Sequence, residues 1–445
     1  MSTKFNVVAA GLVCAALLIP SSSRADTVTD WNALLDSIVP RFGGPQQHER
    51  ARAIVQIAVH DALNTVESRY ETYTDLAAAD PSASPDAAVA AAASGALLGL
   101  LAPLAPSQPK EDAINAIHDM FDATVGPEPY DDETEAGIDA GAAAAAAILA
   151  LRANDGSATP HLPYSELPGL GVYQPTPNPE HPDYITPAFE GWAFVTPFAL
   201  RHSAQFEVEP GAIFDLSSPE YTAQYNQVKT VGDALVRGLA PDSEESDIAR
   251  FWPGGGSNWN LTARVIVDGL GLDLWEHARM FALLNIAAAD ALIANMVWKY
   301  GYKFWRPVTA IRWPDDGNPD TDSDDNWRPF LVTPPYPDFP CGLPTVSGAS
   351  AEALRQFFGT DEIGFERTFN AGQVPLPAPL AALPGKPITR SFDRLSEAEA
   401  EVQMARVYAG IHFYEGCVAG RRHGNKVARF AAQHYLKPVK KGKRP

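Results

Sequence analysis

Four side chains able to bind an anion stand at short spacings in the second half of the sequence. Lys299 and Arg306 are seven residues apart, and Arg406 precedes His412 by six residues. A planar guanidinium can bind two oxygens of an anion at once, and a lysine adds a point charge. We therefore expect these residues to form a cationic cage for a tetrahedral oxyanion.

The overall composition makes such a cage conspicuous. The chain of 445 residues carries a formal net charge of −20 at pH 7. An acidic surface repels nucleic acid and anionic membranes in general, so no nucleic-acid partner is expected. The basic tail 437–445, KPVKKGKRP, is interpreted as a solvated end, with a polyanion contact as the alternative.

The spacing of the cationic residues resembles the three-part signature of the vanadium-dependent haloperoxidases and the type 2 phosphatidic-acid phosphatases. That signature reads K-x6-R-P, then P-S-G-H, then S-R-x5-H. The first part is intact at Lys299 and Arg306, followed by a proline. The third part is present at Arg406 and His412, with Ala405 in place of the serine. The segments that also resemble the bacterial haloperoxidase branch are 31–66, 251–266 and 276–313.

The second part of the signature is altered. The aligned segment reads PCGL, so Cys341 replaces a serine that touches the anion and Leu343 replaces a histidine that moves protons. Gly342 is kept, in a turn whose backbone N–H groups can face an anion. We expect the cage to be retained and the proton shuttle to be lost. Cys341 either contacts the anion or is an inert buried cysteine.

The resemblance implies an all-α protein with two four-helix bundles in one compact domain, residues 26–445, whose signature region is 299–412. In the haloperoxidases the site holds vanadate, with the signature histidine, here His412, as the one protein ligand of the metal, and peroxide and a halide are the substrates. In the phosphatases it holds phosphate, and the same histidine attacks the phosphorus of a phosphate ester. The residues expected to form this oxyanion site are Lys299, Arg306, Cys341, Gly342, Arg406 and His412.

Leucine at position 343 leaves three functional hypotheses open. Loss of one positioned acid or base typically costs about 10² to 10⁴ in rate, whereas electrostatic stabilisation of the oxyanion usually contributes more. The leading hypothesis is a haloperoxidase-like oxidoreductase of weak or altered activity. The alternatives are a phosphatase or diphosphate-processing enzyme that uses the same site, and a catalytically inactive oxyanion-binding protein. A homodimer is common in this family.

The N-terminal segment 1–25 has the features of a secretory signal peptide. A lysine precedes an apolar run, and Ser23 and Ala25 stand at the positions that a signal peptidase prefers. We expect cleavage after Ala25 and a secreted or periplasmic protein without a membrane span; a retained anchor is the alternative, although the run is shorter than the ~20 residues that cross a bilayer. Of the cysteines, Cys341 and Cys417 would remain, and a disulfide between them would remove the Cys341 thiol from the anion.

Apolar residues recur at helical spacing through most of the chain, and strand alternation is scarce. A proline-rich connection is expected at about 156–197. The predicted helices are 49–70, 86–104, 110–125, 133–155, 217–239, 243–251, 258–270, 273–302, 347–358, 396–413 and 416–435.

Several other polar residues are candidates for a functional role. His60, beside Asp61 in an apolar helix, could carry protons in place of the missing histidine, but it also fits a satisfied core histidine. His423 is expected to face solvent or cap the last helix. The acidic run 320–325 lacks the glycine and the closing glutamate of a calcium loop, so it is interpreted as solvated.

Overall fold

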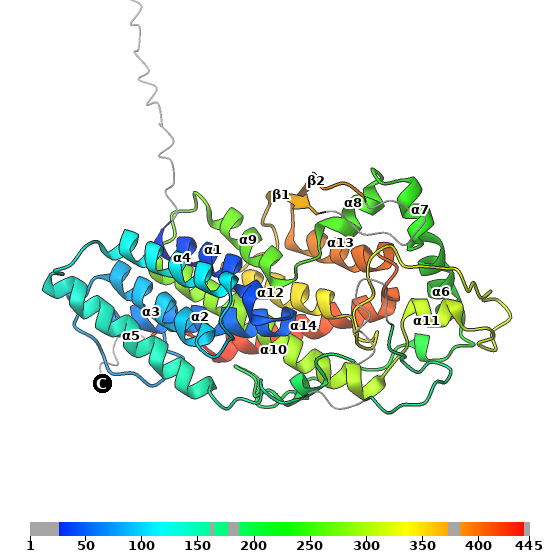
Figure 1. Cartoon of the computed structure of the whole chain (residues 1–445), viewed down its shortest axis with the longest axis horizontal. Coiled ribbons are helices and arrows are strands. Elements are labelled where there is room, and N and C mark those ends of the chain that lie inside the picture. Colours follow the sequence, from blue (N-terminus) through cyan, green and yellow to red (C-terminus); the bar gives the residue numbers. More distant parts are fainter. Residues whose placement is uncertain (1–25, 161–163, 177–186, 373–382, 440–445) are drawn as a thin grey trace, which may run out of the picture.

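The computed structural model describes residues 26–160, 164–176, 187–372 and 383–439. The predicted signal peptide therefore lies outside the described residues, as does the end of the basic tail. The described chain is an elongated, mostly helical molecule, with helices α1 to α5 gathered toward one end and α6, α11 and α13 toward the other (Figure 1). The prediction of an all-α fold built from helical bundles is confirmed.

Small residues bring together the helices of the N-terminal bundle. α3 (Pro85–Leu101) packs along α5 (Asp132–Arg152), and a Cβ atom added to Gly141 would lie only 2.3 Å from the carbonyl oxygen of Ala88. Only a residue without a side chain permits that approach. The other helices of this part are α1 (Thr27–Ile38), η1 (Val39–Phe42), α2 (Pro45–Val66) and α4 (Gln108–Val125).

The second bundle is built around α10 (Leu274–Tyr302), which also packs against α2 and so joins the two bundles. It contains α12 (Gly342–Phe358), α13 (Leu395–Tyr408) and α14 (Tyr414–His434). By length and composition α5 and α10 could each cross a membrane, but the most apolar window of α10 is 94% buried inside the protein, as in a core helix.

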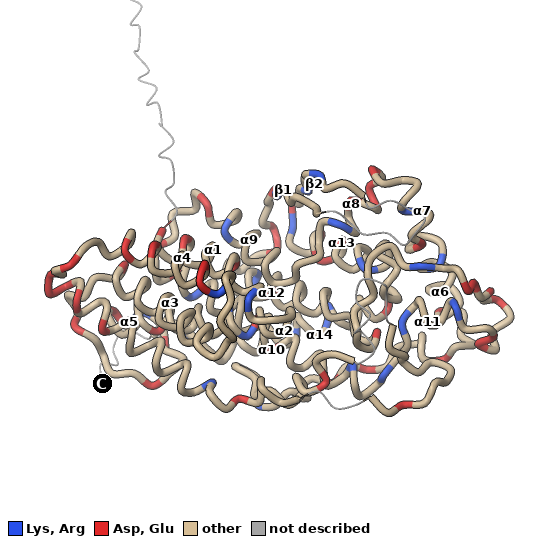
Figure 2. The backbone as a smooth tube through the Cα atoms, in the orientation of Figure 1, with Lys and Arg blue, Asp and Glu red and all other residues tan. Residues whose placement is uncertain are grey.

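The remaining elements form the cover around the two bundles. They are η2 (Glu190–Phe194), η3 (Ala212–Phe214), α6 (Pro219–Val231), α7 (Ala234–Leu239), α8 (Glu244–Phe251), α9 (Gly256–Val267) and α11 (Pro307–Arg312). An antiparallel pair of strands that was not predicted from the sequence is formed by β1 (Phe365–Ala371) and β2 (Lys386–Phe392), and Phe365 pairs with Phe392. Asp and Glu concentrate in surface loops at both ends of the molecule (Figure 2).

Two predicted helices end earlier than expected, because two glycine backbones meet. The helix predicted at 217–239 is divided into α6 and α7, and the helix predicted at 396–413 ends at Tyr408. A Cβ atom added to Gly232 would lie 2.4 Å from the Cα atom of Gly410, and Gly410 has a left-handed φ of 75°. His412 therefore lies in the connection between α13 and α14, not in a helix as predicted.

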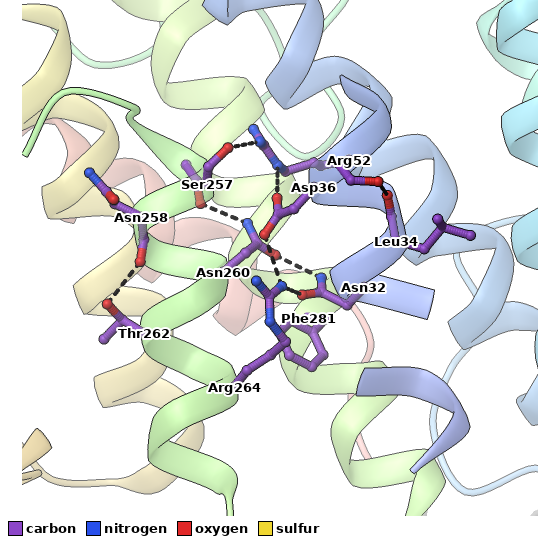
Figure 3. A network of polar contacts seen from close by, with 12 residues as sticks. Asn32, Leu34, Asp36, Arg52, Ser257, Asn258, Asn260, Thr262, Arg264 and Phe281 are labelled. Atoms are coloured by element: carbon purple, nitrogen blue, oxygen red, sulfur yellow. Dashed lines mark hydrogen bonds and ion pairs between the residues drawn. The ribbon is translucent and has the colours of Figure 1, made fainter. Parts of the chain in front are cut away.

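A buried polar network ties α9 to the N-terminal helices (Figure 3). Asn32 donates a hydrogen bond to Asn260 (2.9 Å), and Asp36 accepts from Nε of Arg52 (2.9 Å) and Nη1 of Arg264 (2.8 Å). Buried charges of opposite sign that also share hydrogen bonds are held in defined positions. This network is structural, and it positions the helices that support the second bundle.

Candidate oxyanion site

Lys299 is placed by the last turn of α10 and is completely buried. Its Nζ atom donates to the carbonyl oxygens of Pro337 and Asp338, at 2.8 Å each. Burial, followed by repulsion from Arg306, lowers the pKa of Lys299 to about 7. Its charge at neutral pH thus depends on whether an anion is beside it.

Arg306 immediately precedes α11 and is also completely buried. Nε donates to the carbonyl oxygen of Tyr336 (2.7 Å), and Nη1 donates to the carbonyl oxygen of Ile411 (2.8 Å) and lies 2.9 Å from Nε2 of His412. Its Nη2 atom is buried without a hydrogen-bond partner in the part of the chain that the structure describes. That donor is available to an acceptor in the site.

His412 lies between Arg306 and the carboxylate of Asp338, a residue not predicted from the sequence. Its Nδ1 atom lies 2.8 Å from Oδ1 of Asp338, a residue with no solvent exposure. Since Arg306 can only donate, Nε2 of His412 is the unprotonated nitrogen and Nδ1 carries the proton. Burial and the positive charges of the nearby cations lower the pKa of His412 well below its usual value. Burial raises the pKa of Asp338 to about 7, although the positive charges of Arg306 and Lys299 lower it.

Arg406 lies in the last turn of α13 and is 8% exposed. Its Nε atom is buried without a partner, and the side chain forms no ion pair with any described carboxylate. Its charge is felt by Cys341 and by His412, whose pKa values it lowers. Arg406 therefore belongs to the same cationic cluster as Lys299.

The altered motif forms the start of α12, which begins at Gly342 and not near 345–347 as predicted. A Cβ atom on Gly342 would lie 3.9 Å from Cε of Lys299, so the turn is next to the lysine. Cys341 is the residue before the helix and is completely buried. Burial opposes its ionisation, but a hydrogen bond with Cys417 and the charges of Arg406 and Lys299 lower its pKa overall.

Cys417 and Cys341 are both free thiols in the structure. The expected alternative of a disulfide between them is therefore not the state observed. The structure brings all six predicted site residues into one region, where Cys341 and Gly342 adjoin Lys299 and where Arg306 holds His412. The residue that sequence reasoning missed is Asp338, and its position two residues before the altered motif was the available signal.

The other candidate proton carriers lie elsewhere. Leu343 is partly buried against the main hydrophobic core. His60 is completely buried in α2, where Nδ1 lies 3.1 Å from Asp61 and Asn64 donates toward Nε2 at 3.3 Å, so its contacts are those of a satisfied core histidine. The prediction that His423 faces solvent is wrong: α14 buries it to 2% exposure, and burial lowers its pKa to about 4.

Residues 279–441 match the family model of the VCPO second helical-bundle domain, which contains every residue of the cage. This part of the chain is therefore similar to the second helical-bundle domain of the vanadium chloroperoxidases. It is 28% identical over 184 residues to vanadium chloroperoxidase of Curvularia inaequalis, in an alignment that covers 33% of this chain and 29% of that protein. The match thus spans under a third of that relative.

Solved structures of vanadium haloperoxidases share the fold of the whole described chain. A bacterial vanadium-dependent iodoperoxidase superimposes with a TM-score of 0.73 at 21% identity, covering 93% of this chain and 97% of that one. The holo form of a bacterial vanadium-dependent chloroperoxidase gives a TM-score of 0.67 at 18% identity, covering 93% of each chain. At such identities the likeness shows the fold alone.

Proposed function

We propose that this protein is a vanadium-dependent haloperoxidase-like oxidoreductase that oxidises halide with peroxide, at a rate reduced or altered by Leu343. The observation that carries the proposal is the buried cationic cluster around the unprotonated Nε2 of His412. The match of residues 279–441 to the VCPO second helical-bundle domain and the likeness of the fold to solved haloperoxidases support it.

The residues present fit a tetrahedral oxyanion such as vanadate. Arg306 Nη2 and Arg406 Nε are buried donors without partners among the described residues. Each such group costs about 1 to 3 kcal/mol when left unsatisfied, and an anion with four oxygens would satisfy both. Lys299, Arg306, Arg406 and the backbone at Gly342 would hold the oxygens, with Cys341 beside them. His412 would be the ligand of the metal through Nε2, and Nη1 of Arg306, which donates to that nitrogen in this structure, would turn to an oxygen of the anion.

Bound vanadate would supply a Lewis-acidic centre that activates peroxide toward halide. The chain's own residues supply the surroundings. The carboxylate of Asp338, 2.8 Å from Nδ1 of His412, favours the tautomer with the proton on Nδ1, which leaves Nε2 unprotonated beside Arg306. Lys299, with its pKa of about 7, is the group of the cage that can hold or release a proton at neutral pH. It is therefore the residue that we assign to proton transfer where relatives use the histidine replaced by Leu343.

Hydrolysis of a phosphate ester or diphosphate is the second candidate. It is favoured by the same unprotonated Nε2, which is the form of histidine that can attack phosphorus. The absence of an imidazole at Leu343 weakens both enzymatic proposals equally, since both use that position for proton transfer. An oxyanion-binding protein without turnover is the remaining alternative.

One pair of assays separates these functions. Halide oxidation is measured with peroxide and vanadate, and hydrolysis of a chromogenic phosphate ester is measured on the same preparation without vanadate. We expect halide oxidation that depends on added vanadate and is lost in His412→Ala. Phosphate-ester hydrolysis alone would favour the second candidate. Anion binding without either activity would favour the third alternative, an oxyanion-binding protein without turnover.

Export is proposed from the sequence of residues 1–25. Intact-mass measurement of the protein recovered outside the cytoplasm tests it, and the expected mature N-terminus is Asp26. A recovered protein that still begins at Met1 would contradict cleavage. Size-exclusion chromatography with light scattering on the same sample tests the homodimer.

A further inference from the structure

Arg367 is a buried cation that is not part of the cage. It belongs to β1, and it is only 3% exposed. The side chain points from the hairpin toward the end of α8 and the start of α9. Its guanidinium carbon lies 4.4 Å from the ring centroid of Phe251 and 5.5 Å from that of Trp252. Nη1 donates to Oδ1 of Asn258, at 2.8 Å.

One edge of this guanidinium is free. The Nε and Nη2 atoms of Arg367 lie side by side along that edge, and both are buried without a hydrogen-bond partner among the described residues. A buried donor without a partner is unfavourable, and a buried charge without a partner is more so. Two parallel N–H groups in one plane match the two oxygens of a carboxylate. The free edge therefore has the geometry of a binding site for such a group.

The acidic side chain next to this site is already bound to other groups. Arg390, the residue opposite Arg367 on β2, forms an ion pair with Glu401 of α13. Glu401 also accepts a hydrogen bond from Nε1 of Trp252, at 2.9 Å. Burial lowers the pKa of Arg367 to about 10, without the opposing attraction of a nearby carboxylate. The described chain thus leaves one positive charge here without a counter-charge.

A glycine turn before α9 lies between this arginine and the solvent. Gly254 is exposed, and its φ of 128° is one that only glycine adopts readily. A Cβ atom on Gly254 would lie 3.4 Å from Nδ2 of Asn258, so the turn covers the amide that binds Arg367. The side chain of Asn258 points away from the buried network of α9 (Figure 3). A small ligand that passes Gly254 therefore meets Asn258 and then the guanidinium.

We propose that Arg367 binds the carboxylate of a small organic ligand, at a site separate from the oxyanion cage. The two carboxylate oxygens accept from Nε and Nη2, and the single negative charge matches the single unpaired positive charge. A carboxylate is planar and can lie in the plane of the guanidinium, so it needs no room on the face where Phe251 packs. A tetrahedral anion has further oxygens, which one guanidinium edge does not bind. The site goes beyond the proposed halide oxidation and does not depend on it.

Calorimetric titration with acetate, in a buffer free of phosphate and of other carboxylates, tests the site. We expect one acetate per chain, with the same affinity in Arg406→Ala, in which the cage is weakened, as in the unaltered chain. Arg367→Lys should weaken acetate binding by at least about tenfold, because lysine keeps the charge but cannot present two parallel N–H groups. Arg390→Lys is the matched control on the opposite strand, where the arginine already has a carboxylate partner, and it should leave the affinity unchanged.

A second variant keeps the test decisive if the lysine variant does not fold. Arg367→Gln loses the charge, while its amide can still donate to Asn258, and it should lose acetate binding. Phosphate is titrated in parallel to identify the kind of anion. The proposal is overturned if acetate does not bind, if the variants of Arg367 bind it as the unaltered chain does, or if Arg406→Ala abolishes its binding. It is also overturned if phosphate binding depends on Arg367 and acetate binding does not.

Discussion

The carboxylate of Asp338 lies 2.8 Å from Nδ1 of His412, and both side chains are buried. The same residue accepts a hydrogen bond from Lys299 through its backbone carbonyl oxygen. Asp338 thus connects the end of α10 to the segment between α13 and α14. One residue contacts both the ring of His412, through its carboxylate, and Lys299, through its backbone carbonyl oxygen.

Replacing this carboxylate tests its role as a positioning residue. Asp338→Asn removes the acceptor charge facing Nδ1 but keeps the size of the side chain. Changing the partner of a ligating histidine typically costs about 10- to 100-fold in metal affinity or activity. We expect a fall of that size in vanadate affinity, measured by calorimetry, and in any halide oxidation. Asp325→Asn, in an exposed loop, is the matched control and should change neither quantity. Equal effects of both substitutions would contradict the positioning role.

Vanadate and phosphate should compete for the cage, because both are tetrahedral oxyanions and both would bind to the same buried hydrogen-bond donors. Titration of one ligand in the presence of the other, by calorimetry, measures the competition. Arg406→Ala should weaken both anions by at least about tenfold, since a charge-assisted hydrogen bond contributes about 1.5 to 3 kcal/mol. Arg422→Ala, an exposed arginine of α14, is the control. Independent binding of the two anions would refute a shared site.

The affinity for an anion should fall as the pH rises through about 7, the pKa of buried Lys299. A bound anion favours the protonated lysine, so binding is coupled to proton uptake above that pKa and not below it. The slope should approach about tenfold per pH unit. Tungstate is a suitable probe because its own charge does not change near neutral pH. Lys299→Met should bind more weakly and show a smaller pH dependence, because Asp338, whose pKa is also about 7, still ionises beside the site. An unchanged slope would show that Lys299 is not the group that titrates.

The all-helical fold and the cage residues could be predicted because both depend on local patterns. Helical periodicity marks the apolar faces, and the motif spacing fixes which residue types follow one another along the chain. The role of Asp338 could not be predicted, because its partner His412 is far away in the sequence. The two residues come into contact only in the folded chain. The end of α13 was missed for a similar reason, because the contact between Gly232 and Gly410 joins distant segments.

Packing of α14 on α12 depends on glycine. A Cβ atom on Gly424 would lie 2.0 Å from the backbone carbonyl oxygen of Thr345, so Gly424→Ala must push the two helices apart. Overpacking of this kind costs about 1 to 3 kcal/mol. Gly301→Ala in α10 is the control: a Cβ atom there meets nothing within 4 Å, and alanine should stabilise the helix by about 0.5 to 1 kcal/mol. Urea unfolding of both variants tests the difference, and equal stabilities would contradict it.

Leu343 is the position where this chain departs most from the family signature, and restoring an imidazole there is the most direct test of the lost proton shuttle. Gly342 keeps the backbone beside Lys299, so the imidazole of Leu343→His would be attached next to the cage, at the place of the histidine in the family signature. Turnover in halide oxidation or phosphate-ester hydrolysis should rise by at least about tenfold, which is less than the roughly 10² that a well-placed general acid contributes. Cys341→Ser should add to the gain by restoring a hydroxyl.

The competing effect is burial, because Leu343 packs partly against the main core. An imidazole left there without a hydrogen-bond partner would cost about 1 to 3 kcal/mol of unfolding free energy. Leu343→Asn, a polar side chain that cannot titrate, is the control for that cost and should give no gain in rate. A folded Cys341→Ser, Leu343→His double variant that gains neither activity would mean that the site has been rebuilt for other chemistry.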